Sequence, residues 1–565
     1  MGDDAVNTIF TNPKSPEDFQ KHNAYYVKDA SCDQISDLQV MKSVVALEDR
    51  MQQLLLAGKF KECIELITLI SPQLISNNPI LGVYKAAAML LNEFPQSSIR
   101  DVLSQIQNSP HKRRVIGQTT AIKAVLHSYT KGPDEGIQLS LQALHELKPD
   151  NTFFINFVER NLGVAYALKN DLKNANRWFE RLLLSSHKLN DTGGILAAYN
   201  YLTYIRKVQG RFNDCAVIYK KALVFIESHH LEFLPHSIKI IAGYGHLLLQ
   251  WHQIKDAKTY LNRAIQLAKQ TDILYAQTAY QNLSEAFVRE NKLDRALSVI
   301  QESQKQSEEL DDLYQNIHAY HNQAIEARIH LEAGKIDKAY EWLTSTGIEE
   351  YTKRPTLYHC SDKYGLLVPI AARIYIAREM GHEAIKLLNY FTPKFLQNGA
   401  GSYLIRALNA QAVAFASIGE KNKALTILTK TLKLGQKEGN IGDFILIGRD
   451  LLPLLSSLEK RGCFSTYTKT LIKALSSIGT NNIRHKLPLQ SKSLSSREME
   501  VLTFIAKGMT NREIAVKLYL SASTIKSHSI NIYRKLKVNN RVQAVSKARI
   551  LGILPTENKP AYSVY

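Results

Sequence analysis

Cysteine is scarce in this chain, and its scarcity excludes two kinds of scaffold. The 565 residues include five widely separated cysteines, none at a Cys-x-x-Cys spacing: Cys32, Cys63, Cys215, Cys360 and Cys463. An odd number at these spacings is not typical of a disulfide framework or of a zinc finger. We therefore expect free thiols and no metal site, as in a reduced cytoplasmic protein.

Long apolar runs are also missing. No stretch of the sequence approaches the roughly 20 consecutive apolar residues that a membrane-spanning helix needs. The chain starts with Met1, Gly2, Asp3 and Asp4, whereas a secretory signal starts with basic residues followed by an apolar segment. The sequence therefore predicts a cytoplasmic protein with no membrane contact.

Motifs of catalysis and cofactor binding are absent too. The sequence has no Gly-x-x-x-x-Gly-Lys-Ser/Thr phosphate loop, no His-Glu-x-x-His and no Gly-x-Ser-x-Gly. The nearest approach to metal-binding pairs is His229 beside His230 and His359 beside Cys360, but adjacent residues on a helix point in different directions. We expect neither enzymatic activity, nor a cofactor, nor a metal.

What the chain does have is positive charge, and it is concentrated near one end. The formal net charge is +19, and residues 489–554 carry twelve Lys and Arg against three Glu, a net of +9. Clustered positive charge attracts phosphates through counterion release. The same charge also suits an ordinary solvated surface, so it needs support from local structure.

That support comes from three short helices predicted after residue 494. Ser495 with Glu498, and Thr510 with Glu513, have the spacing of capping boxes, and Ser521 is placed to cap a third helix. Gly508 stands where the first helix would end in a left-handed residue. Because only two residues separate the second helix from the cap of the third, the pattern predicts a helix-turn-helix.

The third helix has two distinct faces. Ile525, Ile532 and Leu536 form the face that packs inward. The opposite face suits the major groove, because lysine can reach guanine acceptors, serine can reach several base edges and an aliphatic side chain can touch a thymine methyl. The residues on that face are Thr524, Lys526, Ser527, Ile530 and Arg534.

The residues Thr510–Ala515, Thr524–His528 and Asn531–Leu536 closely resemble the LuxR-type (GerE-like) DNA-binding domain of bacterial transcription regulators. Two positions depart from that family's pattern, Ser529 for an aliphatic residue and Lys537 for a glycine. The resemblance implies a four-helix domain that binds duplex DNA. The DNA contacts that it and the helix geometry suggest are Thr510, Thr524, Lys526, Ser527, His528, Ile530, Tyr533, Arg534 and Lys535.

The same resemblance implies a homodimer on DNA, formed through a fourth helix. Ala544, Val545 and Ala548 would supply a stripe of small residues for close contact between two such helices. A two-fold dimer reads a roughly palindromic site. RNA polymerase or another regulatory protein is the expected protein partner.

Residues 36–475 are predicted to be helical, with an internal repeat. A turn residue is followed after five positions by a small residue and after nine by a large apolar one, and successive small residues from 175 to 339 lie 40, 42, 39 and 43 positions apart. Gly136 with Ser140 and Ala143 suggests one further copy. The clearest copies are Gly58/Cys63/Ile67, Asn170/Ala175/Phe179, Gly210/Cys215/Tyr219, His252/Ala257/Leu261, Asn291/Ala296/Ile300, Gly334/Ala339/Leu343 and Gly419/Ala424/Leu428.

This pattern indicates stacked helical hairpins, because one hairpin cannot bury its own apolar face. Leu162, Gly163 and Tyr166 with Ala175 and Phe179 resemble the tetratricopeptide repeat, and the long period resembles the sensor region of MalT-type LuxR regulators. That resemblance implies a signal in the form of a protein, a peptide or a small molecule. The nucleotide-switch domain of large MalT-type regulators is not expected in this chain, since the phosphate loop is missing.

The predicted fold class is all-α, a tetratricopeptide-like α-solenoid followed by a small LuxR-type domain. We expect a weakly ordered leader at 1–35, the repeat domain at 36–475, a linker at 476–488 and the DNA-binding domain at 489–565. The predicted function is sequence-specific transcription regulation in response to a signal. The alternative is an interaction adaptor whose helix-turn-helix is vestigial or binds protein.

Overall fold

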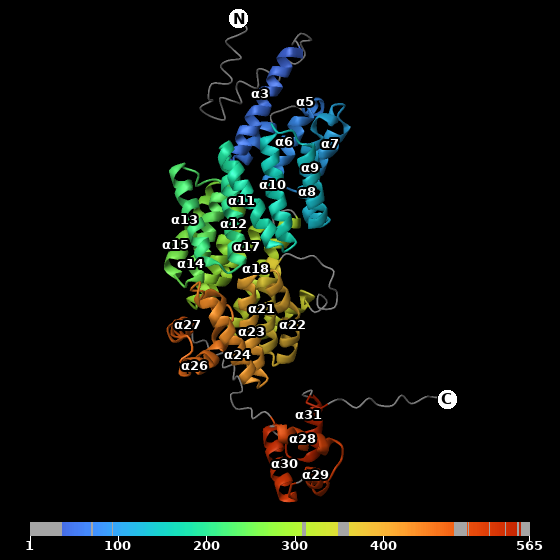
Figure 1. The fold of residues 1–565 in the computed structure, drawn as a ribbon, viewed down its shortest axis with the longest axis vertical. Coiled ribbons are helices and arrows are strands. Elements are labelled where there is room, and N and C mark those ends of the chain that lie inside the picture. Colours follow the sequence, from blue (N-terminus) through green and yellow to red (C-terminus); the bar gives the residue numbers. More distant parts are fainter. Residues whose placement is uncertain are drawn as a thin grey trace, which may run out of the picture. The chain divides into compact units, whose positions relative to one another are not determined.

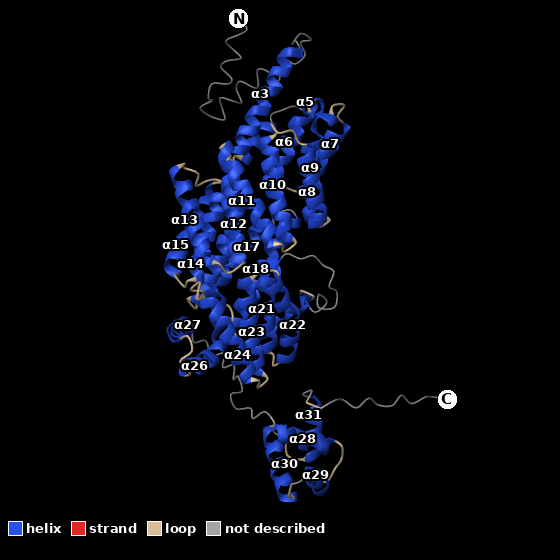
Figure 2. Ribbon diagram, in the orientation of Figure 1, coloured by secondary structure: helices blue, strands red, loops and turns tan. Residues whose placement is uncertain are grey.

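The regular elements that the structure describes are all helices (Figure 2). The computed structural model describes residues 37–68, 72–92, 94–307, 312–348, 361–478, 494, 496–518, 520–536, 538–550 and 553–554, and no strand occurs in them. Helices α3 to α27 form one compact unit and helices α28 to α31 form another. The predicted all-α fold is confirmed. Within these ranges no helix is both long and apolar enough to cross a bilayer.

The first unit is a solenoid of antiparallel helix pairs (Figure 1). Its N-terminal helices are α3 Asp37–Leu56, α4 Phe60–Thr68, α5 Pro72–Asn77, α6 Pro79–Leu91, α7 Gln96–Asn108 and the 3₁₀ helix η1 Lys112–Val115. The pairs follow: α8 Ile116–Thr130 with α9 Pro133–Glu146, α10 Thr152–Leu168 with α11 Leu172–Leu189, α12 Thr192–Val208 with α13 Phe212–Ser228, and α14 Pro235–Gln250 with α15 Ile254–Gln270. After η2 Ile273–Ala276 come α16 Gln277–Arg289 with α17 Leu293–Ser307, α18 Asp312–Glu332 with α19 Ile336–Ser345, α21 Ser361–Ala377 with α22 Gly381–Gln397, and α23 Gly401–Ser417 with α24 Lys421–Gln436. The unit ends with α25 Gly442–Ile445, η3 Gly448–Leu451, α26 Leu452–Lys460 and α27 Ser465–Ser477.

The turn within each helix pair is made by a residue of left-handed conformation. All seven turn residues in the clearest predicted copies have a positive φ: Gly58 (76°), Asn170 (64°), Gly210 (73°), His252 (60°), Asn291 (58°), Gly334 (77°) and Gly419 (89°). The small residue five positions later is at most 1% exposed in every one of these copies. The predicted repeat is therefore confirmed, and its cause is the close approach of the two helices.

Two copies differ from the prediction. Gly136 lies inside α9, and the turn before that helix is made by Gly132, whose φ is 115°. A Cβ on Gly136 would come within 2.0 Å of Ser128 Oγ, so the glycine serves close packing of α8 on α9. The other difference is a copy that the pattern missed, in which Glu379 makes the turn with a φ of 62° and Ala384 and Leu388 are fully buried.

Charged side chains join the first helices of successive pairs. Glu285 on α16 accepts hydrogen bonds from Arg328 on α18, 43 residues later. Glu332 on α18 accepts from Arg373 on α21, at 2.8 Å and 41 residues later. These separations are close to the repeat length, so each ion pair links one repeat to the next.

Segments far apart in the sequence also meet within the solenoid. The indole Nε1 of Trp251 donates to the carbonyl of Glu438, 187 residues away, at 3.0 Å. The backbone N–H of Ile441 donates to the carbonyl of Gln250 at 2.8 Å. The end of α14 therefore packs against the segment between α24 and α25. The turn after α12 also approaches the start of α23, where a Cβ on Gly401 would meet the carbonyl of Gln209 at 2.3 Å.

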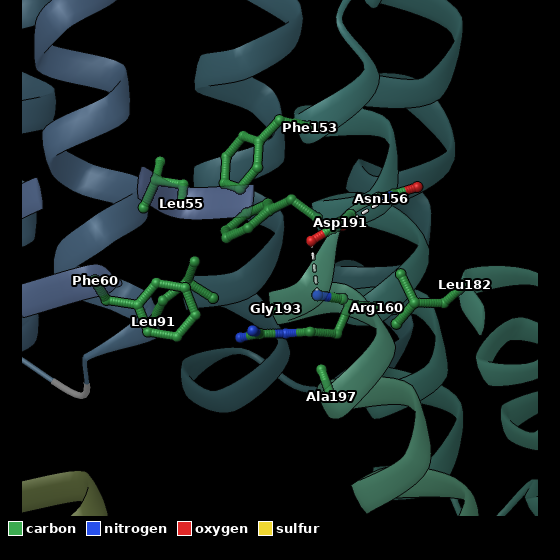
Figure 3. A pocket seen from close by; sticks show the side chains of 12 residues that line it. Leu55, Phe60, Leu91, Phe153, Asn156, Arg160, Leu182, Asp191, Gly193 and Ala197 are labelled. Atoms are coloured by element: carbon green, nitrogen blue, oxygen red, sulfur yellow. Dashed lines mark hydrogen bonds between the residues drawn. The ribbon is translucent and has the colours of Figure 1, made fainter. Parts of the chain in front are cut away.

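A buried carboxylate fixes the start of α12 (Figure 3). Asp191 Oδ1 accepts from the backbone N–H of Gly194 at 2.7 Å, and Oδ2 accepts from Asn156 Nδ2 on α10 at 2.7 Å. Burial raises the pKa of Asp191, and these hydrogen bonds counteract that effect. The pocket beside it, which Arg160 also lines, holds about 30 Å³. We therefore assign Asp191 a capping role, which is structural.

The second unit contains four helices around its own core. They are α28 Ser496–Ala506, α29 Asn511–Leu518, α30 Ala522–Leu536 and α31 Arg541–Ile550. Gly508 has a φ of 82°, as predicted for a residue that follows the end of a helix. The fully buried core residues include Val501, Leu502, Ile514, Ile525 and Ile532.

Candidate nucleic-acid interface

Helix α30 presents a continuous exposed row, which is the candidate DNA-reading surface. Lys526, Ser527 and Arg534 are exposed, and Ile530 is 55% exposed although it is aliphatic. The hydroxyl of Ser527 donates to the carbonyl of Ser523 at 3.1 Å, so its lone pairs stay on the surface. Ile530 is not part of the domain core, and an exposed aliphatic side chain between a lysine and an arginine is of the kind that can contact a thymine methyl.

Two caps orient the start of this region. The backbone N–H of Thr524 donates to Ser521 Oγ at 3.1 Å, which confirms the predicted cap of α30. Before α29, the N–H of Thr510 donates to Glu513 Oε2 at 2.6 Å and the N–H of Glu513 donates to Thr510 Oγ1 at 3.4 Å. This is the predicted capping box. The hydrogen bonds from Thr510 lower the pKa of Glu513, so the carboxylate stays ionised at neutral pH.

The back of α30 is held by packing and by one unusual residue. Ser529, which departs from the LuxR pattern, is 4% exposed and its hydroxyl donates to the carbonyl of Ile525 at 2.9 Å. The polar group is therefore satisfied within the helix, as a buried hydroxyl requires. Ile525 and Ile532 on either side are fully buried, so the substitution leaves the helix anchored.

Two arginines of the domain are structural. Arg497 on α28 donates to the carbonyl of Leu518, at the end of α29, at 2.7 Å. Arg541 at the start of α31 donates to the carbonyls of Ile505 and Met509, at the end of α28 and just after it. Both guanidinium groups satisfy helix-end carbonyls and so fix the angles between the helices.

Lys535 requires a correction. It was predicted to add affinity for the DNA backbone, but its side chain is only 13% exposed and its ammonium pairs with Glu498, which is 6% exposed. The pair joins α30 to α28, so Lys535 belongs to the domain interior. Glu498 was predicted to complete a capping box with Ser495, and Ser495 lies outside the described residues.

The remaining predicted contacts differ in their exposure. Thr524, His528 and Tyr533 are half-buried, and Tyr533 packs against the domain core. Thr510 is exposed, with its hydroxyl donating to Glu513 at 2.8 Å. Their contact with DNA stays a prediction. Lys537, the second departure from the LuxR pattern, lies outside the described residues.

The predicted dimerisation stripe on α31 needs a second correction. Ala544 and Ala548 are fully buried in the core of their own domain, and Val545 is half-buried. Two buried alanines have no surface to offer to a partner. The apolar side chain that α31 does expose is Val542, at 78%. Dimerisation through this helix stays a prediction, with Val542 in place of the alanines.

Sequence reasoning missed part of the basic surface. Arg512 and Lys517 on α29 are exposed, and Lys507 and Lys517 both lie over the ring of Phe504, at 5.8 and 5.7 Å from its centre. These cations add exposed positive charge on α29 and just after α28. The net charge of the segment was a signal for them, but charge alone did not tell exposed cations from paired ones.

Comparison with known protein families agrees with the fold. The family described as "MalT-like TPR region" matches residues 117–461, which is more than half of the chain, and "Bacterial regulatory proteins, luxR family" matches residues 492–548. Together they define the class: a DNA-binding transcription regulator of the helix-turn-helix type. The chain belongs to the MalT-like TPR family, and its C-terminal domain is of the luxR family.

Similar proteins include the HTH-type transcriptional regulator MalT of Vibrio parahaemolyticus, which is 22% identical over 532 residues, covering 86% of this chain and 55% of the relative. The MalT of Vibrio cholerae is 28% identical over 184 residues, covering 28% of this chain and 20% of that protein. The chain thus spans about half the length of the first of these relatives.

Two solved structures match the chain at low similarity. The Rap protein complexed with Competence and Sporulation Factor is 13% identical with a TM-score of 0.38, covering 70% of this chain and 99% of that one. The Cut9–Hcn1 hetero-tetramer of the APC/C is 12% identical with a TM-score of 0.34, covering 83% and 98%.

Proposed function

We propose that α30 enters the major groove of duplex DNA and reads its sequence. The single observation that carries this proposal is the exposed row of Lys526, Ser527, Ile530 and Arg534 on a helix whose opposite face is fully buried. Lysine, serine and an aliphatic residue offer three different contacts to base edges, and an exposed arginine can bind a phosphate. The solenoid receives a signal and changes the affinity of this helix for DNA.

Selection of bound duplexes from a random library, with the full chain at near-physiological salt, tests the DNA-reading role. We expect enrichment of one motif, and a two-fold symmetric motif would also support a dimer. Failure to enrich any motif would contradict sequence-specific binding and favour the adaptor alternative.

The variant Lys526→Ala tests the placement of α30. Loss of a base or phosphate contact should weaken specific binding by about 1–3 kcal/mol. The matched control is Lys221→Ala, because Lys221 is exposed on α13 of the solenoid and carries the same charge. Titrations at several salt concentrations distinguish the two kinds of contact: a phosphate contact reduces the salt slope, and a base contact relaxes specificity at one position. Equal affinity of both variants for the selected motif would show that α30 does not lie in the groove.

A further inference from the structure

A polar cavity of about 230 Å³ lies inside the solenoid. Its walls come from the first helices of consecutive pairs, α12, α14, α16, α18, α21 and α23, and from α25 beyond them. These helices belong to repeats that meet through the long-range contacts of Trp251 and Gln250. The cavity is therefore a product of the folded solenoid as a whole, and no single repeat could form it.

Positive charge exceeds negative charge in the cavity wall. The wall contains one carboxylate, Glu285, and four cations: Lys207, Arg289, Arg328 and Arg406. Glu285 is shared, because Arg289 Nε lies 2.7 Å from it and Arg328 also contacts it. Arg406 pairs with the buried Asp443 at 2.6 Å.

Lys207 is the cation that has no such partner. Within the described part of the chain, no carboxylate lies within ion-pair distance of its ammonium, which sits 5.3 Å from the centre of the Tyr204 ring. Lys207 is half-buried, so it is neither fully solvated nor neutralised. A half-buried cation of this kind gains free energy from an anion, because the local dielectric is lower than that of water.

Two buried polar atoms of the wall lack hydrogen-bond partners. Gln250 Oε1 and Arg328 Nε accept or donate no hydrogen bond, although Arg328 Nε lies 3.7 Å from Glu332 Oε1, and both residues are 3% exposed. Unsatisfied buried polar groups cost about 1–3 kcal/mol each and are rare in native proteins. The Nε2 of Gln250 lies 3.0 Å from His246 Nε2, so the amide is fixed with its oxygen unpaired. A bound molecule with hydroxyl groups and an anionic group would satisfy both atoms.

The lowered pKa of His246 agrees with a positive electrostatic potential in the cavity. Its pKa lies well below the ordinary value, first because of burial and then because of the neighbouring charges of Lys207, Arg406 and Arg289. The imidazole is therefore neutral near pH 7 and can serve as a hydrogen-bonding group. Thr278, on the facing helix α16, adds a hydroxyl to the wall.

We propose that this cavity binds a small hydroxylated anion, a metabolite that carries a phosphate or a carboxylate group, with Lys207 as its main counter-charge. The proposal deepens the sensing role of the solenoid and rests on the proposed function only for the consequence on DNA affinity. The binding itself depends on the cavity alone.

Calorimetric titration and thermal unfolding of the full chain without DNA test the site. Inorganic phosphate and citrate are the two probes, at constant ionic strength adjusted with chloride. Phosphate stabilises many proteins by exclusion from their surface, so the comparison of variants decides the result. The variants are Lys207→Met, Lys207→Arg, which keeps the charge, and the control Lys221→Met on the exposed face of α13.

We expect saturable binding of at least one probe, weakened about tenfold or more by Lys207→Met and largely retained by Lys207→Arg and Lys221→Met. Saturation by phosphate alone or by citrate alone identifies which anionic group the cavity takes. Absence of saturable binding, or equal affinity of Lys207→Met and the original chain, would overturn the proposal. Saturable binding that leaves the affinity for the selected DNA motif unchanged would uphold the anion site and refute its regulatory role.

Discussion

The pair of Glu498 and Lys535 yields a prediction that separates a structural lysine from a DNA-binding one. Lys535→Met removes the ion-pair partner on α30 of a carboxylate that is 6% exposed. Loss of one member of a buried ion pair costs about 3–5 kcal/mol, because the other charge stays buried without compensation. That is a large part of the roughly 5–15 kcal/mol that stabilises a typical domain.

The assay is urea denaturation of the segment 484–565, with unfolding monitored by circular dichroism. This segment contains the second compact unit with its own core. Lys535→Met should lower the midpoint strongly, and DNA affinity of the full chain should fall with it. Lys526→Ala should also weaken DNA binding, but with little change in the midpoint, because Lys526 is exposed on α30.

A double variant makes the test decisive. Glu498→Leu combined with Lys535→Met removes both members of the ion pair, and replacements of this kind are often neutral or stabilising. Stability should therefore return close to that of the original domain, and DNA affinity should return with it. If Lys535→Met lost DNA affinity at unchanged stability, or if the double variant recovered stability without affinity, Lys535 would be a DNA contact and our correction would be wrong.

Two further predictions concern the solenoid. Asn291→Ala should destabilise it by about 1 kcal/mol while Asn291→Gly should not, because a φ of 58° disfavours residues with a Cβ other than Asn; chemical denaturation of both variants checks this. Acidification should also destabilise the solenoid: burial lowers the pKa of His236 and of His246 well below normal and that of His252 to about 4. The unfolded state then binds more protons below about pH 6.5, and each histidine contributes a slope of up to ~1.4 kcal/mol per pH unit. The melting temperature should fall between pH 7 and pH 5. The fall should be less steep in His252→Asn, in which asparagine suits the left-handed turn. A melting temperature that does not change with pH would contradict the lowered pKa values of these histidines.

The sequence predicted the repeats well because each copy depends on local rules. A left-handed turn residue, a small residue and a large residue at fixed offsets are required wherever two helices approach closely. The copy at Glu379 was missed because glutamate is not a residue that usually marks such a turn, although its φ is 62°. There the surrounding packing, with Ala384 and Leu388 fully buried, outweighs the local preference.

The DNA-reading row followed from helical periodicity, but Lys535 did not. Whether a lysine on a recognition helix faces solvent or a buried carboxylate depends on the packing of a helix 37 residues away in the sequence. The cavity wall was missed for a related reason. Its ion pairs, such as Glu285 with Arg328, join positions one repeat apart. A search for opposite charges separated by the repeat length would have found them.

The hydrogen bond between Trp251 and Glu438 has a consequence for how the solenoid unfolds. A linear array of repeats gains stability from nearest neighbours only, so it can unravel from either end while its centre stays folded. Here the loss of the last helices would also remove the partners of α14, near the middle of the array, at Gln250. Melting should therefore be more cooperative than in an open array. A change at the C-terminal end of the solenoid can then alter the stability of repeats nearly 190 residues away. Binding of a ligand in the cavity, whose wall includes both segments, can have the same effect.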